Sequence, residues 1–324
     1  MKNIIPDISR QIYKEDIKKL IENKYSTLGP LWVNYQIEWM NGIYSSFKNH
    51  DKFLIIIYLL KKTIDVYSRS FVLLSYDQFY ERDTVEIKKF NISEISYELN
   101  IPKESARRKI YELVKLGVIK KNKKKFLIDR FCFNHVKPEN SIKRMARFLA
   151  ILSNLYNKEN FISRKITSSE LETVIKNNFS YIWKIYYEMQ IPMMLTYKKV
   201  FKDLETFHIF GACVVNQHIR IEKLNNLRTH RTNYLGAIFL DKKIQGINAM
   251  SISDITGIPR ATAIRKLQKL VKNNYLTIDE KKHYRLTGNF AKQLLPIQKI
   301  VLDRLANFSS KVFNSIEISS KNKT

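Results

Sequence analysis

The chain contains 324 residues, of which 44% are hydrophobic, with only eight glycines and seven prolines. This composition excludes a disordered polymer, favours helices over a turn-rich β architecture and gives room for about two domains. The formal net charge of +27, from 57 Lys and Arg against 30 Asp and Glu, indicates a polyanionic partner, and nucleic acid is the leading candidate. An AT-rich genome would explain many of the lysines but not the shortage of acids. An anionic membrane surface is the alternative, but no long basic amphipathic helix with a wide apolar face supports it.

The cysteines and the apolar segments indicate an intracellular location. Cys132 and Cys213 offer neither a disulfide framework nor a Cys-x-x-Cys metal spacing, which is typical of a reducing compartment. Asp7 precedes any apolar run that could form an export signal. The longest apolar run, Phe53–Leu60, is too short to cross a bilayer. We therefore expect a cytoplasmic protein without membrane contact.

Apolar periodicity predicts the following elements in chain order. A helical lead-in occupies 1–50, and a helix at about Lys52–Tyr67 follows it. The segment Ile92–Leu99 places its apolar residues on one helical face. Pro102 then ends this helix and suits the start of the next one, Lys103–Leu116.

Two short strands are expected after these helices. Gly117 fits the C-terminal cap, and Val118–Lys120 and Lys125–Ile128 read as strands joined by a lysine-rich turn. Helix, tight turn, helix and hairpin form the succession of a winged helix-turn-helix. A helical middle region, 137–205, is expected next.

The same succession recurs in the second half of the chain. The segment "GIPRATAIRKLQKL" (Gly257–Leu270) matches "NIPKESARRKIYEL" (Asn100–Leu113), and the alignment extends without a gap from Ile92/Ala249 to Ile119/Leu276. Asn100 and Gly257 stand at the turn, where both residue types tolerate a left-handed backbone. The residues that recur identically are Ile95, Ser96, Ile101, Pro102, Ala106, Arg108, Lys109, Leu113, Val114 and Lys115 of the first copy.

The second copy is expected to have its own flanking elements. A helix at about Asn233–Ile247 precedes it, and Ile252, Ile255 and Ile258 supply apolar positions around its first helix. Its second helix has an inner stripe of Ala263, Leu267 and Leu270. Its strands are Tyr275–Ile278 and His283–Leu286, with Asp279–Lys282 at the tip.

The segment Gly257–Leu270 resembles the recognition-helix segment of bacterial winged-helix regulators, the IclR and MarR groups in particular. The resemblance covers about Ile92–Ile128 and Ala249–Leu286 and implies DNA binding through the second helix of each copy. Those groups usually carry one such unit per chain. Two units in one chain resemble plasmid replication initiators.

The candidate DNA-binding residues lie on the second helix of each copy. Because Ala106 is at the centre of the buried stripe, Arg108 lies almost opposite, and Arg265 holds the same position in copy two. Arginine there can contact guanine or phosphate. Arg107 is replaced by Ile264, which suits a thymine methyl group, so the two helices should read different sequences. The helix starts supply the remaining candidates, which are Lys103 and Ser105 in copy one and Arg260 and Thr262 in copy two.

The hairpin tips are expected to contact phosphate. "KKNKKK" (Lys120–Lys125) forms the first tip, with Lys121, Lys123 and Lys124 as candidates. The second tip contributes Lys281 and Lys282. A run of charge is usually only a solvated loop, but its position in a winged helix favours phosphate.

Other chemistry has weaker support. The six histidines show no metal-binding spacing, and no cofactor is expected. The segment "RTHRTNY" (Arg228–Tyr234) faintly suggests a tyrosine nucleophile, although a loop leading into a helix explains it better. The aromatic and Met-rich stretch Phe179–Met194 reads as a helical core, with an effector pocket as the alternative.

The C-terminal helix carries an apolar stripe that could dock on its own chain or form a homodimer, and the dimer is slightly favoured. The stripe consists of Ile297, Val301, Leu305, Phe308 and Val312. The predicted domains are the lead-in 1–50, a first winged-helix domain 51–136, a middle region 137–205, a second winged-helix domain 206–290 and a C-terminal helix with a disordered tail 291–324.

The sequence thus predicts a mainly α protein with two winged helix-turn-helix units. The expected partner is double-stranded DNA, and the expected function is transcriptional regulation without enzymatic activity. A plasmid or phage replication initiator is the first alternative, and a DNA-processing enzyme is the second.

Overall fold

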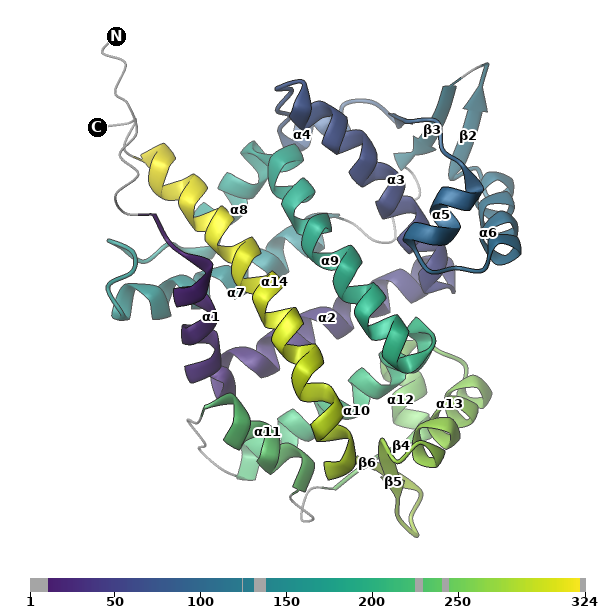
Figure 1. Ribbon diagram of the computed structural model, residues 1–324, viewed down its shortest axis with the longest axis vertical. Coiled ribbons are helices and arrows are strands. Elements are labelled where there is room, and N and C mark those ends of the chain that lie inside the picture. The colour runs from purple at the N-terminus through teal and green to yellow at the C-terminus, as the bar shows by residue number, and fades with distance from the viewer. Residues whose placement is uncertain (1–10, 124, 131–137, 225–229, 241–244, 321–324) are drawn as a thin grey trace.

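The computed structural model describes residues 11–123, 125–130, 138–224, 230–240 and 245–320, which form a mainly helical protein with two small antiparallel sheets (Figure 1). The prediction of a mainly helical chain with small β elements is confirmed. Within the described ranges, every helix is too short or too polar to cross a membrane.

The described elements follow one another in the same order twice. The first series is α1 (Lys14–Asn23), α2 (Tyr25–Phe47), α3 (His50–Arg69), α4 (Tyr76–Tyr80), β1 (Thr84–Ile87), α5 (Ile92–Glu98), α6 (Lys103–Lys115), β2 (Ile119–Asn122), β3 (Lys125–Asp129) and α7 (Pro138–Lys158). The second series is α8 (Ser168–Asn177), α9 (Phe179–Phe201), α10 (Leu204–Leu224), α11 (Arg231–Leu240), β4 (Ile247–Asn248), α12 (Ala249–Thr256), α13 (Arg260–Lys272), β5 (Leu276–Ile278), β6 (His283–Leu286) and α14 (Gly288–Ser320).

Each series contains one compact α/β unit, which we call unit 1 (84–129) and unit 2 (247–286). The strand orders are β1-β3-β2 and β4-β6-β5, so the two sheets have the same topology. The turn between the two helices has the left-handed backbone expected from the sequence, with φ of 49° at Asn100 and 68° at Gly257. α6 and α13 each have 13 residues and bury the expected apolar stripes.

The helices that precede the units are also duplicated. α1 and α8 have 10 residues each, α2 and α9 have 23 each, and a single residue, Lys24 or Asn178, separates the members of each pair. α2 and α9 both end at a left-handed lysine, Lys48 or Lys202. The next residue, Asn49 or Asp203, then accepts a backbone N–H of the first turn of α3 or α10. The repeat therefore extends far upstream of units 1 and 2.

The two series pack on each other reciprocally. α1 packs against α14 and α8 against α7, while α3 packs against α9 and α10 against α2. Gln36 and Gln190 occupy the same position in α2 and α9, are both buried, and exchange two amide hydrogen bonds of 3.2 and 3.0 Å. Each contact between two helices is thus repeated between their counterparts in the other series. Such reciprocal contacts indicate twofold symmetry. The chain is an internal pseudo-dimer with α2 and α9 at its axis.

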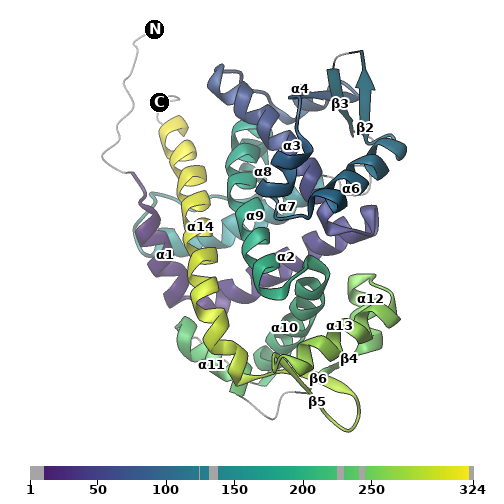
Figure 2. The same cartoon turned by 45° about the vertical axis from the view of Figure 1, so that its right-hand side comes forward.

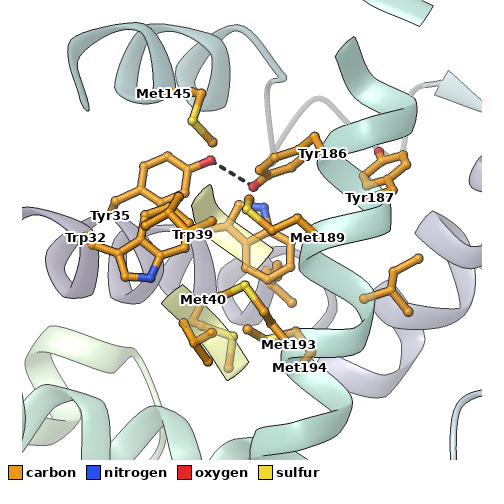
Figure 3. Packing of buried hydrophobic residues seen from close by; sticks show 14 of the residues in the cluster. Trp32, Tyr35, Trp39, Met40, Met145, Tyr186, Tyr187, Met189, Met193 and Met194 are labelled. Atoms are coloured by element: carbon orange, nitrogen blue, oxygen red, sulfur yellow. Dashed lines mark hydrogen bonds between the residues drawn. The ribbon is translucent and has the colours of Figure 1, made fainter. Parts of the chain in front are cut away.

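The core lies along this axis. α2 contributes Trp32, Tyr35 and Met40, and α9 contributes the Met-rich stretch that the sequence assigned to a helical core, which the burial confirms (Figure 3). The hydroxyl groups of Tyr35 and Tyr186 are 2.8 Å apart. Burial is the main cause that raises the pKa of both tyrosines, so both stay protonated.

Several expectations about unit 2 are wrong. The helix at Asn233–Ile247 is not continuous, because α11 ends at Leu240 and Ile247 belongs to β4. The helix that packs on both α12 and α13 is α10, which lies further upstream. The short helix α11 and the strand β4 lie between α10 and α12, just as α4 and β1 lie between α3 and α5. Ile255 is 42% exposed and does not join the apolar face of α12.

The C-terminal stripe is buried within its own chain. Val301, Leu305, Phe308 and Val312 are at most 3% exposed, and α14 packs against α1 and α9. Of the two alternatives for this stripe, docking on its own chain is the one seen for these four residues, while Ile297 is half-buried, and the homodimer stays a prediction. The expected domain limits at 205/206 and 290/291 fall inside α10 and α14.

Candidate nucleic-acid interface

The second helix of each unit presents an arginine to solvent. Ala106 is fully buried in α6, and the side chain of Arg108, two residues on, is 70% exposed. Ala263 and Arg265 have the same arrangement in α13. Burial of the alanine stripe against the preceding helices therefore turns one arginine outward in each unit, as predicted.

The start of each helix adds further positive charge. Lys103 and Arg260 are the first residues of α6 and α13 and are exposed, while Ser105 and Thr262 are half-buried. Arg107 lies 3.3 Å from Glu104, and Arg108 lies 3.9 Å from Glu112. Ion pairs at exposed positions contribute about 0–1 kcal/mol, so a phosphate or a base can replace the carboxylate partner.

The first hairpin separates its lysines into two groups. Lys120 pairs with Asp129, and Lys125 pairs with Glu86 at 2.7 Å, so these two stabilise the sheet. Lys121 and Lys123 are exposed and have no acidic partner within the described ranges. Lys124, also predicted as a contact, lies outside the described residues.

In the second hairpin, the carboxylate of Asp279 stabilises the turn. Asp279 accepts the backbone N–H of His283 at 2.8 Å and lies 3.5 Å from its ring. The hydrogen bond from His283 lowers the pKa of Asp279, so this carboxylate is held in the turn. Lys281 and Lys282 are exposed at the same tip.

A groove of about 700 Å³ runs between α13 and the second hairpin. Its lining includes the basic residues Arg260 and Lys282 and the apolar residues Ile264, Met250 and Ile278. Ile264, which was predicted to suit a thymine methyl group, is half-buried and lines this groove. Three predicted contact residues thus come together at one concave surface.

Two buried lysines were not predicted as functional residues. Lys109 and Lys266 follow the exposed arginines and are each 9% exposed. Lys266 Nζ lies 2.7 Å from Asp203 Oδ2 and 3.9 Å from Glu205 Oε2, and Lys109 Nζ lies 3.9 Å from Asp51 Oδ2. Their recurrence in both copies could have drawn attention to them, but recurrence alone does not indicate burial, because Lys115 and its counterpart Lys272 also recur and are exposed.

These lysines fix the presenting helices to the helical core. Asp51 and Glu205 occupy the same position in α3 and α10, so the two ion-pair sets are equivalent. Unit 1 gains a second link between the same helices, because Lys52 pairs with Glu112 at 2.7 Å. The orientation of α6 and α13 is therefore set by the core.

The other candidate residues lie in the core. Tyr234 is 3% exposed, and its hydroxyl lies 3.0 Å from Nδ1 of His218, so it does not face solvent. Cys213 is buried, and burial raises the pKa of its thiol to about 12. No group of His, Cys, Asp or Glu within the described ranges is arranged to hold a metal ion.

The two presenting helices lie on one side of the molecule. α6 and α13 are at the right in both views, with hairpin β2–β3 above them and β5–β6 below (Figures 1 and 2). Helix α1 and the C-terminal end of α14 lie on the opposite side in Figure 1. Comparisons with known protein families, with curated proteins and with solved structures give no match.

Proposed function

We propose that the chain binds double-stranded DNA through units 1 and 2 acting as winged helices, and that it is a transcriptional regulator. The observation that carries the proposal is the paired exposure of Arg108 and Arg265 on equivalent helices at one side of the molecule. In a winged helix the second helix enters the major groove and its outward residues reach base edges. The regulatory role rests on the resemblance of Gly257–Leu270 to bacterial regulators.

The lysines of the hairpin tips support the proposal through their position. Lys121 and Lys123 in unit 1 and Lys281 and Lys282 in unit 2 extend the basic surface beyond the presenting helices. Contacts of this kind are made to phosphate, which positions a protein without reading sequence. Arg260 and Lys282, which both line the groove beside α13, are further candidates for phosphate contacts.

The test is the salt dependence of duplex binding, measured by fluorescence anisotropy. Six or more phosphate contacts lower the affinity by about 10³ or more between about 50 and 200 mM salt. Replacing Lys121 and Lys123 with Ala should weaken binding to all sequences and reduce the salt slope by about one unit for each lysine–phosphate interaction removed.

A matched control changes the same charge elsewhere. Lys158 and Lys165 are exposed at and beyond the end of α7, outside both units, and their replacement with Ala should leave the slope unchanged. Affinity that is independent of salt, or equal effects of the two double variants, would refute the proposal.

A further inference from the structure

The twofold relation between the series determines how units 1 and 2 face a ligand. A residue that contacts its own counterpart must lie on the symmetry axis, and Gln36 and Gln190 do so with reciprocal hydrogen bonds of 3.2 and 3.0 Å. The helix pairs α1–α14 and α8–α7 surround this axis reciprocally. Units 1 and 2 are therefore related by a rotation, with opposite directions along the molecule, and not by a translation.

Each unit is also held by the opposite series. Lys198 of α9 is buried and donates to Asp51 at 2.9 Å and to the carbonyl oxygen of Leu99, at the end of α5, at 3.3 Å. On the other side α12 packs against α2. The helical core therefore fixes the separation and relative orientation of α6 and α13. Two units joined only by flexible linkers would have no fixed separation.

We propose that one chain binds one imperfect inverted repeat, with α6 in one half-site and α13 in the other. This inference rests on the proposed DNA binding. A protein with twofold symmetry places its two reading helices in successive major grooves about one helical turn apart, and the dyad of the DNA then coincides with that of the protein. Here both reading helices belong to a single chain, so no second copy is needed. The opposed directions of the two hairpins in Figure 1 agree with this arrangement.

The surface residues predict in what way the repeat is imperfect. Arg108 and Arg265 are equivalent and exposed, so the half-sites should share a guanine at the position they contact. Arg107 is replaced by Ile264 and Tyr111 by Gln268, so flanking positions should differ. Unit 1 has the exposed Lys121 and Lys123 at its hairpin, whereas the tip of unit 2 begins with Asp279 and Glu280.

The experiment selects duplexes from a random library with the full-length protein and determines the stoichiometry of the bound complex by mass photometry. We expect two related half-sites in inverted orientation with one fixed spacing, bound by one chain. In the selected duplex, reversing one half-site or inserting about five base pairs, half a helical turn, should lower the affinity at least about tenfold.

Two variants assign the half-sites. Arg108→Ala should relax the preference in one half-site only, and Arg265→Ala in the other only, while circular dichroism confirms that both variants are folded. Direct repeats, a single half-site, tolerance of half-turn insertions or two chains per duplex would overturn this inference while leaving DNA binding intact. Absence of salt-dependent binding to any duplex would instead overturn the proposed function, and this proposal with it.

Discussion

Replacing Lys266 with Met tests how much its ion pair with Asp203 stabilises the protein. The equivalent residue Lys109 lies farther from its acidic partner and provides the comparison. Methionine retains most of the buried side-chain volume but removes the ammonium group that lies 2.7 Å from Asp203 Oδ2. Burial raises the pKa of Asp203, but hydrogen bonds from Lys266 and Thr206 outweigh it and hold the pKa below its usual value. The variant leaves this carboxylate charged and partly buried without its cation.

The structure sets the size of the loss. Breaking a fully buried pair costs about 3–5 kcal/mol, and because the side chain of Asp203 is 36% exposed, we expect about 2 kcal/mol. Lys109 is the matched control, since it is the equivalent residue with the same exposure. Its partner Asp51 is 3.9 Å away and keeps Lys198 at 2.9 Å, so Lys109→Met should cost less than about 1 kcal/mol.

Urea unfolding followed by circular dichroism measures both losses, with an unchanged dependence on urea showing that the native state is intact. The double variant Lys266→Met with Asp203→Asn should recover part of the stability, because the carboxylate closest to Lys266 is removed, Glu205 is farther away at 3.9 Å, and the asparagine still caps α10. Equal losses for the two lysine variants, or a larger loss for Lys109→Met, would refute this reasoning.

Two further predictions concern stability. Burial lowers the pKa of His50 and His218 to about 3 and that of His208 well below 6.5. At a pH between the folded and unfolded pKa values, the unfolded chain therefore binds more protons than the folded chain. The free energy of unfolding should reach its full value at about pH 8 and be lower by about 4 kcal/mol at about pH 5.5, as urea midpoints at these two pH values would show, and a flat profile would contradict the burial of neutral histidines. Gly257→Ala should cost about 1–2 kcal/mol in thermal or urea unfolding, because φ is 68° and an added Cβ meets no atom within 4 Å, so only backbone strain contributes. Asn100→Ala at the equivalent turn, with φ of 49°, is the control and should show a comparable loss; a neutral effect at both positions would show that the strain is relieved.

The sequence predicted the local structure of the units because short-range rules govern it. Pro102 and Pro259 directly precede α6 and α13, and the left-handed turn falls at Asn100 and Gly257. A helix stripe and a turn residue act over a few positions, so periodicity and backbone preference are sufficient to find them.

The larger duplication was hardly visible in the sequence, because twofold symmetry requires equivalent backbone positions but not identical residues. Equivalent positions in α2 and α9 keep Met40/Met194 and Phe47/Phe201, but Trp32 corresponds to Tyr186. Near the axis the two series fill one shared core, so their side chains must be complementary and need not be identical. Only a few positions, such as Gln36/Gln190, are both complementary and identical.

The same distinction holds for the candidate site. Exposure of Arg108 and Arg265 follows from the angle to a buried alanine, which the sequence contains. The inward position of Lys266 depends on Asp203, which is distant in the chain and arrives through the packing of α10 on α13. A pattern along one helix cannot reveal a partner on another.

The reciprocal packing predicts that neither series is stable alone. Ile17 and Ile21 of α1 are at most 1% exposed, and α14 of the other series packs against this helix. Arg164 and Lys165 are exposed in the segment that joins α7 to α8, so a chain break between them spares the core. Co-expressed fragments 1–164 and 165–324 should purify together as a helical complex that unfolds cooperatively. Either fragment expressed alone should aggregate or pair with itself, because its half of the axial core has no cover. A fragment that is monomeric and unfolds cooperatively would show that the two series are independent domains and that the axis contributes little to folding.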